Sequence, residues 1–203
     1  ANAIVHAGAV PVFVDIDLST YNMDPNYIEE AITPRTRAIL AVHQIGCPAA
    51  MDEINQIAVR RELIVIEDAA CAIGSQYKGQ RVGRPHSVMA CFSFHPRKIL
   101  TAGEGGMITT ADANVAARLR RLRQHAMTVS DIARHSASKV VIESYDEVGY
   151  NYRMTDLQAA VALVQLQRLD EMLSRRRMLA ERYSAAFSKL AWLKVPDEPA
   201  ECT

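Results

Sequence analysis

The fold is decided by the stretch Leu63-Ile64-Val65-Ile66-Glu67-Asp68, in which four apolar residues lead into two acids. An apolar run without polar alternation is typical of a strand that is buried on both faces of a parallel sheet. Ligands of open α/β sheets lie beyond the carboxyl ends of such strands. We therefore expect Asp68 at a ligand site, although an Asp at this position could also cap the next helix.

Strand-like and helix-like runs alternate on both sides of this stretch. Strands are predicted near residues 11–15, 38–42, 63–68, 88–94 and 107–110, and helices near residues 26–32, 51–61 and 113–125. This alternation favours an α/β protein, a three-layer sandwich with a mostly parallel central sheet.

The periodic pattern lapses over residues 127–149, where we expect interface or substrate contacts. A long helix is predicted from Thr155, with Asp156 in its first turn. We interpret its apolar side as core-facing; the residues are Leu157, Ala160, Val161, Leu163, Val164, Leu166 and Leu169. Residues 175–177, three arginines, are expected on a solvated helix face.

Further polar side chains follow the strand predicted at 88–94. Ser93 alternates with Phe92 and Phe94, so its hydroxyl can point away from both rings and bind a phosphate near the strand end. Lys98 follows directly, and glycines at 103, 105 and 106 either let backbone pass close to a ligand or form an ordinary turn. A carboxylate beside a pyridine nitrogen, a lysine and a phosphate-binding hydroxyl are what pyridoxal phosphate chemistry requires.

Seven ordered motifs extend this pattern over nearly the whole chain. They lie at residues 8–15, 42–46, 67–70, 92–94 with Lys98, 103–106, 122–125 and 149–156. Together they resemble the DegT/DnrJ/StrS family of pyridoxal-phosphate-dependent aminotransferases, most of which act on nucleotide-linked keto-sugars. The resemblance implies the large domain of fold type I pyridoxal-phosphate enzymes, with one antiparallel strand in the sheet.

The resemblance also implies roles for single residues. Lys98 would be the Schiff-base lysine, Asp68 the partner of the pyridine nitrogen, and Ser93 a ligand of the cofactor phosphate. In the family, the segment that matches residues 149–156 reaches into the active site of the neighbouring subunit. Asn151 and Arg153 would therefore help to hold the phosphate across the interface of a homodimer with a shared active site.

Three further positions match the family without a settled role. His43 and His125 match positions near the substrate, and no chemistry is assigned to them. Cys71 stands where many relatives have histidine or glutamine close to the cofactor, which makes it a cofactor-binding candidate; because a thiol is a weak donor, packing is the favoured role. Some relatives that catalyse a dehydration have histidine in place of the lysine, so Lys98 favours amino transfer.

The implied function is transfer of an amino group from an amino acid, glutamate by family analogy, to a nucleotide-linked keto-sugar. The alternatives are a non-nucleotide keto-sugar or cyclitol as acceptor, an aromatizing dehydration, and a non-catalytic regulatory homologue that keeps the cofactor. A generic nucleotide-binding domain is disfavoured because no Gly-x-Gly-x-x-Gly fingerprint or Walker loop follows any strand.

Composition agrees with one sizeable globular core. The chain has 203 residues, 49% of them hydrophobic, and a formal net charge of zero, so neither nucleic acid nor a membrane is expected as a partner. There is no apolar run of spanning length and no signal-peptide pattern in the first residues, and a cytoplasmic location is expected. The four cysteines lack metal-binding spacing; we expect reduced thiols and no metal site.

Residues 1–168 are predicted to form the large cofactor-binding domain, incomplete at its N-terminus. Residues 169–203 are predicted to form a helix that leads into a truncated C-terminal small domain. The chain starts without methionine and stops soon after Trp192, so we interpret it as a fragment. Family members have an upstream phosphate-binding turn and a downstream small domain, and this piece alone is therefore expected to bind cofactor weakly and to turn over slowly or not at all.

Overall fold

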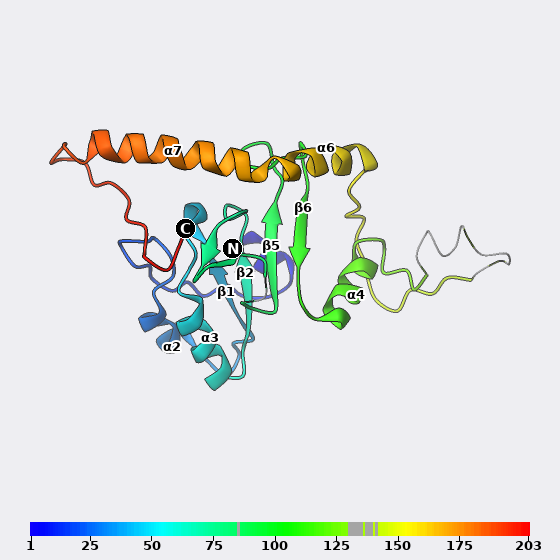
Figure 1. The fold of residues 1–203 in the computed structure, drawn as a ribbon. Helices are drawn as coiled ribbons and strands as arrows, with labels where there is room; N and C mark the ends of the chain where they lie inside the picture. The colour runs from blue at the N-terminus through cyan, green and yellow to red at the C-terminus, as the bar shows by residue number, and fades with distance from the viewer. Residues whose placement is uncertain (85, 130–135, 137–139, 141) are drawn as a thin grey trace.

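A four-stranded sheet stands at the centre of the computed structural model, which describes residues 1–84, 86–129, 136, 140 and 142–203 (Figure 1). The strands have the order β1-β2-β5-β6, with β1 at Ala38–Val42, β2 at Ile64–Asp68, β5 at Met89–Ser93 and β6 at Gly106–Thr109. β1, β2 and β5 run parallel, and β6 pairs antiparallel with β5. This mostly parallel sheet with one antiparallel strand confirms the predicted fold class.

Helix α3 (Met51–Arg60) covers one face of β1 and β2. Its buried residues Met51, Ile54 and Ala58 share an apolar cluster with Ile39 and Val65 of the two strands. The other helices that precede α6 are α1 (Asn2–His6), the short helices η1 (Pro25–Tyr27), α2 (Ile28–Ala31) and η2 (Gln44–Gly46), and α4 (Ala113–Leu122) among the described residues. The predicted helices at 51–61 and 113–125 are thus confirmed to within three residues, and the one at 26–32 is split between η1 and α2.

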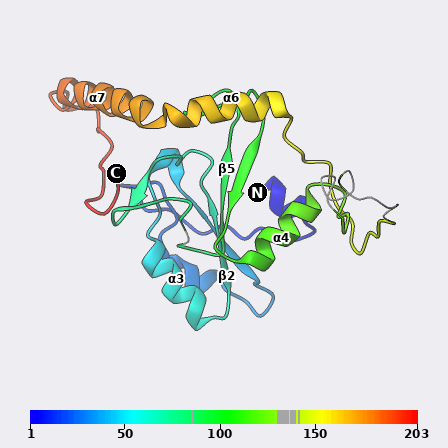
Figure 2. The same cartoon turned by 45° about the vertical axis from the view of Figure 1, so that its right-hand side comes forward.

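Two helices run end to end above the carboxyl ends of the parallel strands, α6 (Asp156–Gln167) and α7 (Leu169–Phe187) (Figures 1 and 2). α6 begins at a capping box in which the Thr155 hydroxyl accepts from the Gln158 amide and the Gln158 side chain bonds back to the Thr155 backbone. The helical path is interrupted at Arg168, with φ −97° and ψ 3°. The helix predicted from Thr155 therefore ends at Gln167, and a second helix follows it.

Two features of the predicted strand pattern are wrong. Residues 11–15 form no strand, because Pro11 has no N–H to donate and Val12 and Phe13 are 64% and 80% exposed, with only Val14 packed against the core. A small antiparallel hairpin, β3 (Gln76–Tyr77) with β4 (Gln80–Arg81), was not predicted. Two-residue strands carry too few residues to show a period of two.

The apolar side of α6 is not core-facing as predicted. Ala162 packs against a cluster of Phe94, Leu100 and Ala102, and Leu169 at the start of α7 is buried. The other large apolar side chains are about half exposed or more: Leu157, Val161, Leu163, Val164 and Leu166. α6 is apolar around most of its circumference, so one stripe meets the sheet and the rest stays uncovered in this chain.

The arginines at 175–177 and the loop predicted at 127–149 were both expected at the surface or an interface. Residues 175–177 are exposed on α7, as predicted. Residues 130–135, 137–139 and 141 of the loop predicted at 127–149 lie outside the described residues, and the contacts expected there stay a prediction. Among the described residues, none of the helices has the length and apolar character needed to cross a membrane.

Candidate active site

Asp68 is the last residue of β2 and has a neighbouring strand on each side, with Val42 and Cys91 as its partners in register. Its Oδ1 accepts from the Ala70 amide at 3.1 Å. No helix begins there; the chain continues as turns to β3, so the alternative role as a helix cap is wrong. Within the described part of the chain, no hydrogen bond occupies Oδ2, which leaves that oxygen to a ligand.

The turn that begins at Asp68 meets the loop that follows β5. Lys98 lies in this loop, where its amide donates to the His95 carbonyl, and its Nζ donates to Cys71 Sγ at 3.1 Å. Cys71 is exposed, so the packing role favoured from the sequence is wrong. The thiol is a neighbour of the lysine, and this contact brings the Asp68 and Lys98 segments to one edge of the sheet.

Ser93 is the last residue of β5 and pairs with Gly106. Phe92 and Phe94 on either side of Ser93 pack in apolar clusters, in agreement with the predicted alternation. The half-buried Ser93 hydroxyl accepts from the His95 amide at 3.3 Å and keeps its own hydrogen for another acceptor. A Cβ on Gly106 would lie 2.8 Å from the Phe92 carbonyl oxygen, so this glycine is needed for strand packing.

The loop after β1 packs on the turn after β2. Gly46 has φ +97°, and a Cβ there would lie 3.0 Å from the Cys71 carbonyl oxygen. Ser75 Oγ donates to the Gly46 carbonyl at 2.7 Å. The loops after three parallel strands therefore meet at the carboxyl edge of the sheet, which is where open α/β sheets hold their ligands.

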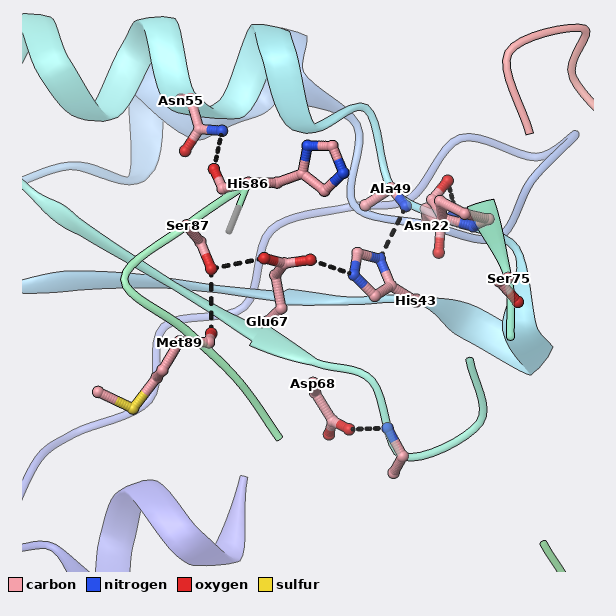
Figure 3. Close-up of polar contacts among 12 residues, drawn as sticks. Asn22, His43, Ala49, Asn55, Glu67, Asp68, Ser75, His86, Ser87 and Met89 are labelled. Carbon is pink, nitrogen blue, oxygen red and sulfur yellow. Dashed lines mark hydrogen bonds and ion pairs between the residues drawn. The ribbon is translucent and has the colours of Figure 1, made fainter. Parts of the chain in front are cut away.

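His43 lies behind this edge, in the core. The residue is 1% exposed, its Nε2 lies 2.8 Å from Glu67 Oε2, and its Nδ1 accepts from the Ala49 amide at 3.0 Å (Figure 3). Both ring nitrogens have protein partners in this arrangement. The contacts favour a structural role for His43 and do not support the substrate contact expected for it.

The remaining candidates form a separate group next to the end of α4. The His125 amide donates to the Tyr150 carbonyl at 2.7 Å, and Arg153 Nε donates to Asn151 Oδ1 at 3.2 Å. His125, Asn151 and Arg153 are all exposed. Within the described residues, no hydrogen bond joins this group to Asp68, Ser93 or Lys98 of the same chain.

Burial and charge act together on the cysteine opposite Asp68. Burial of Cys91 and, to a smaller extent, the charges of Asp68 and Glu67 raise the pKa of its thiol. Cys91 thus stays a neutral thiol at ordinary pH. All four cysteines are free, as expected.

Three buried or half-buried polar residues behind this edge were not predicted from the sequence as functional candidates: Asn22, Glu67 and Ser87. Asn22 is 4% exposed and binds the loop after β1, with Nδ2 donating to the Cys47 carbonyl at 3.0 Å and Oδ1 accepting from the Gln44 amide at 2.8 Å. Glu67 could have been found from the sequence, because a charged residue next to an apolar strand segment is buried only with a polar partner. Asn22 and Ser87 lie in loops and carried no comparable signal.

The residues at this edge fit pyridoxal phosphate by their chemistry. Asp68 at the end of β2 offers a free carboxylate oxygen, Ser93 at the end of β5 a hydroxyl hydrogen, and Lys98 in the loop after β5 an amine. With the mostly parallel sheet, this set is typical of the cofactor-binding domain of pyridoxal-phosphate proteins of fold type I.

The comparisons with known proteins make the assignment specific. The family model described as the DegT/DnrJ/EryC1/StrS aminotransferase family matches residues 1–202. The chain belongs to this family, which uses pyridoxal phosphate, and the resemblance seen in the sequence is confirmed. Spore coat polysaccharide biosynthesis protein SpsC of Bacillus subtilis is 43% identical over 196 residues, which are 97% of this chain and 50% of that protein.

Solved structures agree with the fold. DesV of S. venezuelae, in complex with a ketimine intermediate, matches with a TM-score of 0.90 and 36% identity over 100% of this chain and 51% of that one. DesI, solved in the presence of its TDP-sugar product, matches with a TM-score of 0.84 and 32% identity over 97% of this chain and 47% of that one. The chain thus spans about half the length of the relatives that it matches.

Proposed function

We propose that the complete protein is a pyridoxal-phosphate-dependent aminotransferase that transfers an amino group from an amino acid to a nucleotide-linked keto-sugar. The observation that carries the proposal is the contact of Lys98 Nζ with Cys71 at 3.1 Å, because it holds the lysine beside the turn that begins at Asp68. A lysine and a pyridinium partner at one sheet edge are the two groups that this chemistry cannot do without.

When bound, the cofactor supplies an electron sink that lets an amino group pass between two carbon skeletons. Lys98 Nζ would hold the cofactor aldehyde and, as a free amine, would move a proton between two carbons. Asp68 Oδ2 would keep the pyridine nitrogen protonated, and the Ser93 hydroxyl would bind the phosphate. Cys71 accepts a hydrogen bond from Lys98 Nζ and so orients the amine.

The substrate class is supported by the relatives. DesI was solved with a TDP-sugar product, and SpsC is named for spore coat polysaccharide biosynthesis. Glutamate as the amino donor is carried over by family analogy. A keto-sugar without a nucleotide, or a cyclitol, remains the alternative acceptor.

A homodimer is part of the proposal. Asn151 and His125 are exposed beside the end of α4, and within the described residues no hydrogen bond joins them to Asp68, Ser93 or Lys98, which supports a role for them in the site of a second subunit. The exposed Arg153, which donates to Asn151 Oδ1, is proposed to act with them. The uncovered apolar side chains of α6 supply contact area, Leu157 being 82% exposed. The cofactor domain at 1–168, the start of a small domain at 169–203 and a cytoplasmic location stay predictions.

The experiment is done on the complete protein. It is incubated with pyridoxal phosphate, reduced with borohydride and digested, and the pyridoxyl adduct is located by mass spectrometry. We expect the adduct on Lys98 and none in Lys98→Arg, which keeps the charge. An adduct elsewhere, or none in folded, cofactor-saturated protein, would refute the role of Lys98.

Turnover is then measured as formation of 2-oxoglutarate from glutamate with a panel of nucleotide-linked and free keto-sugars. Amination of only free sugars would change the acceptor class. A bound cofactor without amine exchange from any donor would favour the non-catalytic homologue.

A further inference from the structure

A buried polar chain lies behind the Asp68 edge, on the α3 side of the sheet. His43 Nε2 and Glu67 Oε2 are 2.8 Å apart, and Ser87 Oγ lies 2.6 Å from Glu67 Oε1 and 3.0 Å from the Met89 carbonyl oxygen (Figure 3). His43 and Glu67 are each 1% exposed. The chain thus connects β1, β2 and the segment that enters β5.

The position of the hydrogen on the His43 ring follows from the partners of its two nitrogens. The Ala49 amide can only donate, so His43 Nδ1 must accept, at 3.0 Å, and the ring hydrogen lies on Nε2. Nε2–H then donates to Glu67 Oε2. In this arrangement the imidazole is uncharged, and the contact is a directed hydrogen bond instead of an ion pair.

Glu67 and Asp68 are adjacent on β2 and leave it on opposite sides (Figure 3). Glu67 lies on the same face as Val65, under α3, whereas Asp68 faces the ligand edge. The His43 amide also donates to the Asp68 carbonyl at 3.0 Å. The ends of β1 and β2 are therefore joined twice, once through backbone and once through the two buried side chains.

We propose that the His43–Glu67–Ser87 chain is a positioning device, which fixes the twist of β2 at its last residue and thereby the direction of the Asp68 carboxylate. The inference rests on the role proposed for Asp68. The backbone around Asp68 is bonded to both neighbouring strands, since the Asp68 carbonyl accepts from the His43 amide at 3.0 Å and the Ala69 amide donates to the Cys91 carbonyl at 2.9 Å. The buried side chains add a further link one residue earlier, at Glu67, and loss of that link would let the Glu67–Asp68 peptide tilt and turn the carboxylate away from the pyridine nitrogen. Side chains that hold a reactive group in place change activity about 10- to 100-fold when they are removed.

The test uses the complete, cofactor-loaded protein and three variants. Glu67→Leu keeps the volume and removes both bonds. Glu67→Gln can keep both, with its carbonyl oxygen facing His43 and its amide donating to Ser87, which then donates to Met89. Asn55→Leu is the matched control, because Asn55 Nδ2 donates to the His86 carbonyl at 2.6 Å in the same region without a bond to Glu67 or Asp68.

We measure the absorption spectrum of the bound cofactor against pH, its dissociation constant, and kcat and KM for the amino donor. Glu67→Leu is expected to lower kcat about 10- to 100-fold with a smaller change in KM, and to shift the spectrum in the direction that Asp68→Asn does. Glu67→Gln should restore most of both. In an Asp68→Asn background, Glu67→Leu should leave the spectrum without a further shift.

A Glu67→Leu protein that only loses stability, as Asn55→Leu does, with an unchanged spectrum and kcat would overturn the proposal. Should Glu67→Leu fail to fold, Ser87→Ala carries the test, and an unchanged spectrum and kcat in that variant would equally overturn it. An unchanged spectrum in Asp68→Asn would instead reject the role proposed for Asp68, so the two failures are distinguishable.

Discussion

Gly149→Ala is expected to detach the segment that carries Asn151 and Arg153 from the end of α4. A Cβ at this position would lie 2.1 Å from the Ala126 nitrogen and 2.3 Å from the His125 carbonyl carbon. Both are backbone atoms, which cannot turn aside as a flexible side chain could. The segment would therefore have to move by more than about 1 Å.

Three short backbone hydrogen bonds depend on the close approach of Gly149 to the backbone of His125 and Ala126. The Tyr150 amide donates to Leu122 at 2.7 Å, the His125 amide to Tyr150 at 2.7 Å, and the Tyr152 amide to Arg123 at 2.8 Å. Each is worth about 0.5–1.5 kcal/mol net, so losing them together costs about 1.5–4.5 kcal/mol. A cost of about 2 kcal/mol corresponds to about 30-fold faster amide exchange.

The assay is hydrogen exchange of the Tyr150 and Tyr152 amides in the complete protein, together with the dissociation constant for pyridoxal phosphate. If Asn151 and Arg153 bind the phosphate, that constant should rise at least about tenfold. Gly79→Ala is the control. A Cβ at Gly79 would strain the backbone, because φ is +76°, but would contact no neighbouring atom. Unchanged exchange and unchanged affinity in Gly149→Ala would refute the reasoning.

Three further predictions concern stability and thiol chemistry. Ile54→Ala should lower the free energy of unfolding, measured in urea, by about 2–5 kcal/mol, since Ile54 is 0% exposed. Val59 is 78% exposed, so Val59→Ala should change that free energy by less than about 0.5 kcal/mol. Equal effects would contradict the assignment of the core face of α3. Burial raises the pKa of the Cys202 thiol from 9.0 to about 11, so the stability that the neutral thiol contributes is present below pH 9 and is lost as pH rises towards 11. Cys202→Ala should therefore flatten the fall of unfolding free energy in that window, and an unchanged slope would count against it. Cys71 is exposed, so iodoacetamide should label it before the half-buried Cys91, and bound pyridoxal phosphate should slow that labelling; labelling of Cys91 first would contradict the described packing.

Much of the site was readable from the sequence because its residues follow strands directly. Asp68 ends an apolar run and Ser93 sits between two phenylalanines, and local patterns of this kind depend on neighbours in the chain. The contact of Cys71 with Lys98 joins residues 27 positions apart. No local pattern encodes that distance, and the sequence accordingly suggested packing for a thiol that is exposed.

The sequence by itself determined the α/β alternation, the strand ends that bear Asp68 and Ser93, the loop position of Lys98, and the family. These depend on side-chain periodicity and on short motifs, both of which are local. Only the tertiary structure decided that His43 is buried against Glu67, that α6 leaves most of its apolar surface uncovered, and that Asn151 pairs with Gln124 beside the end of α4. The physical reason is that burial and hydrogen-bond partners are set by segments far apart in the chain, and these come together only when the sheet has formed.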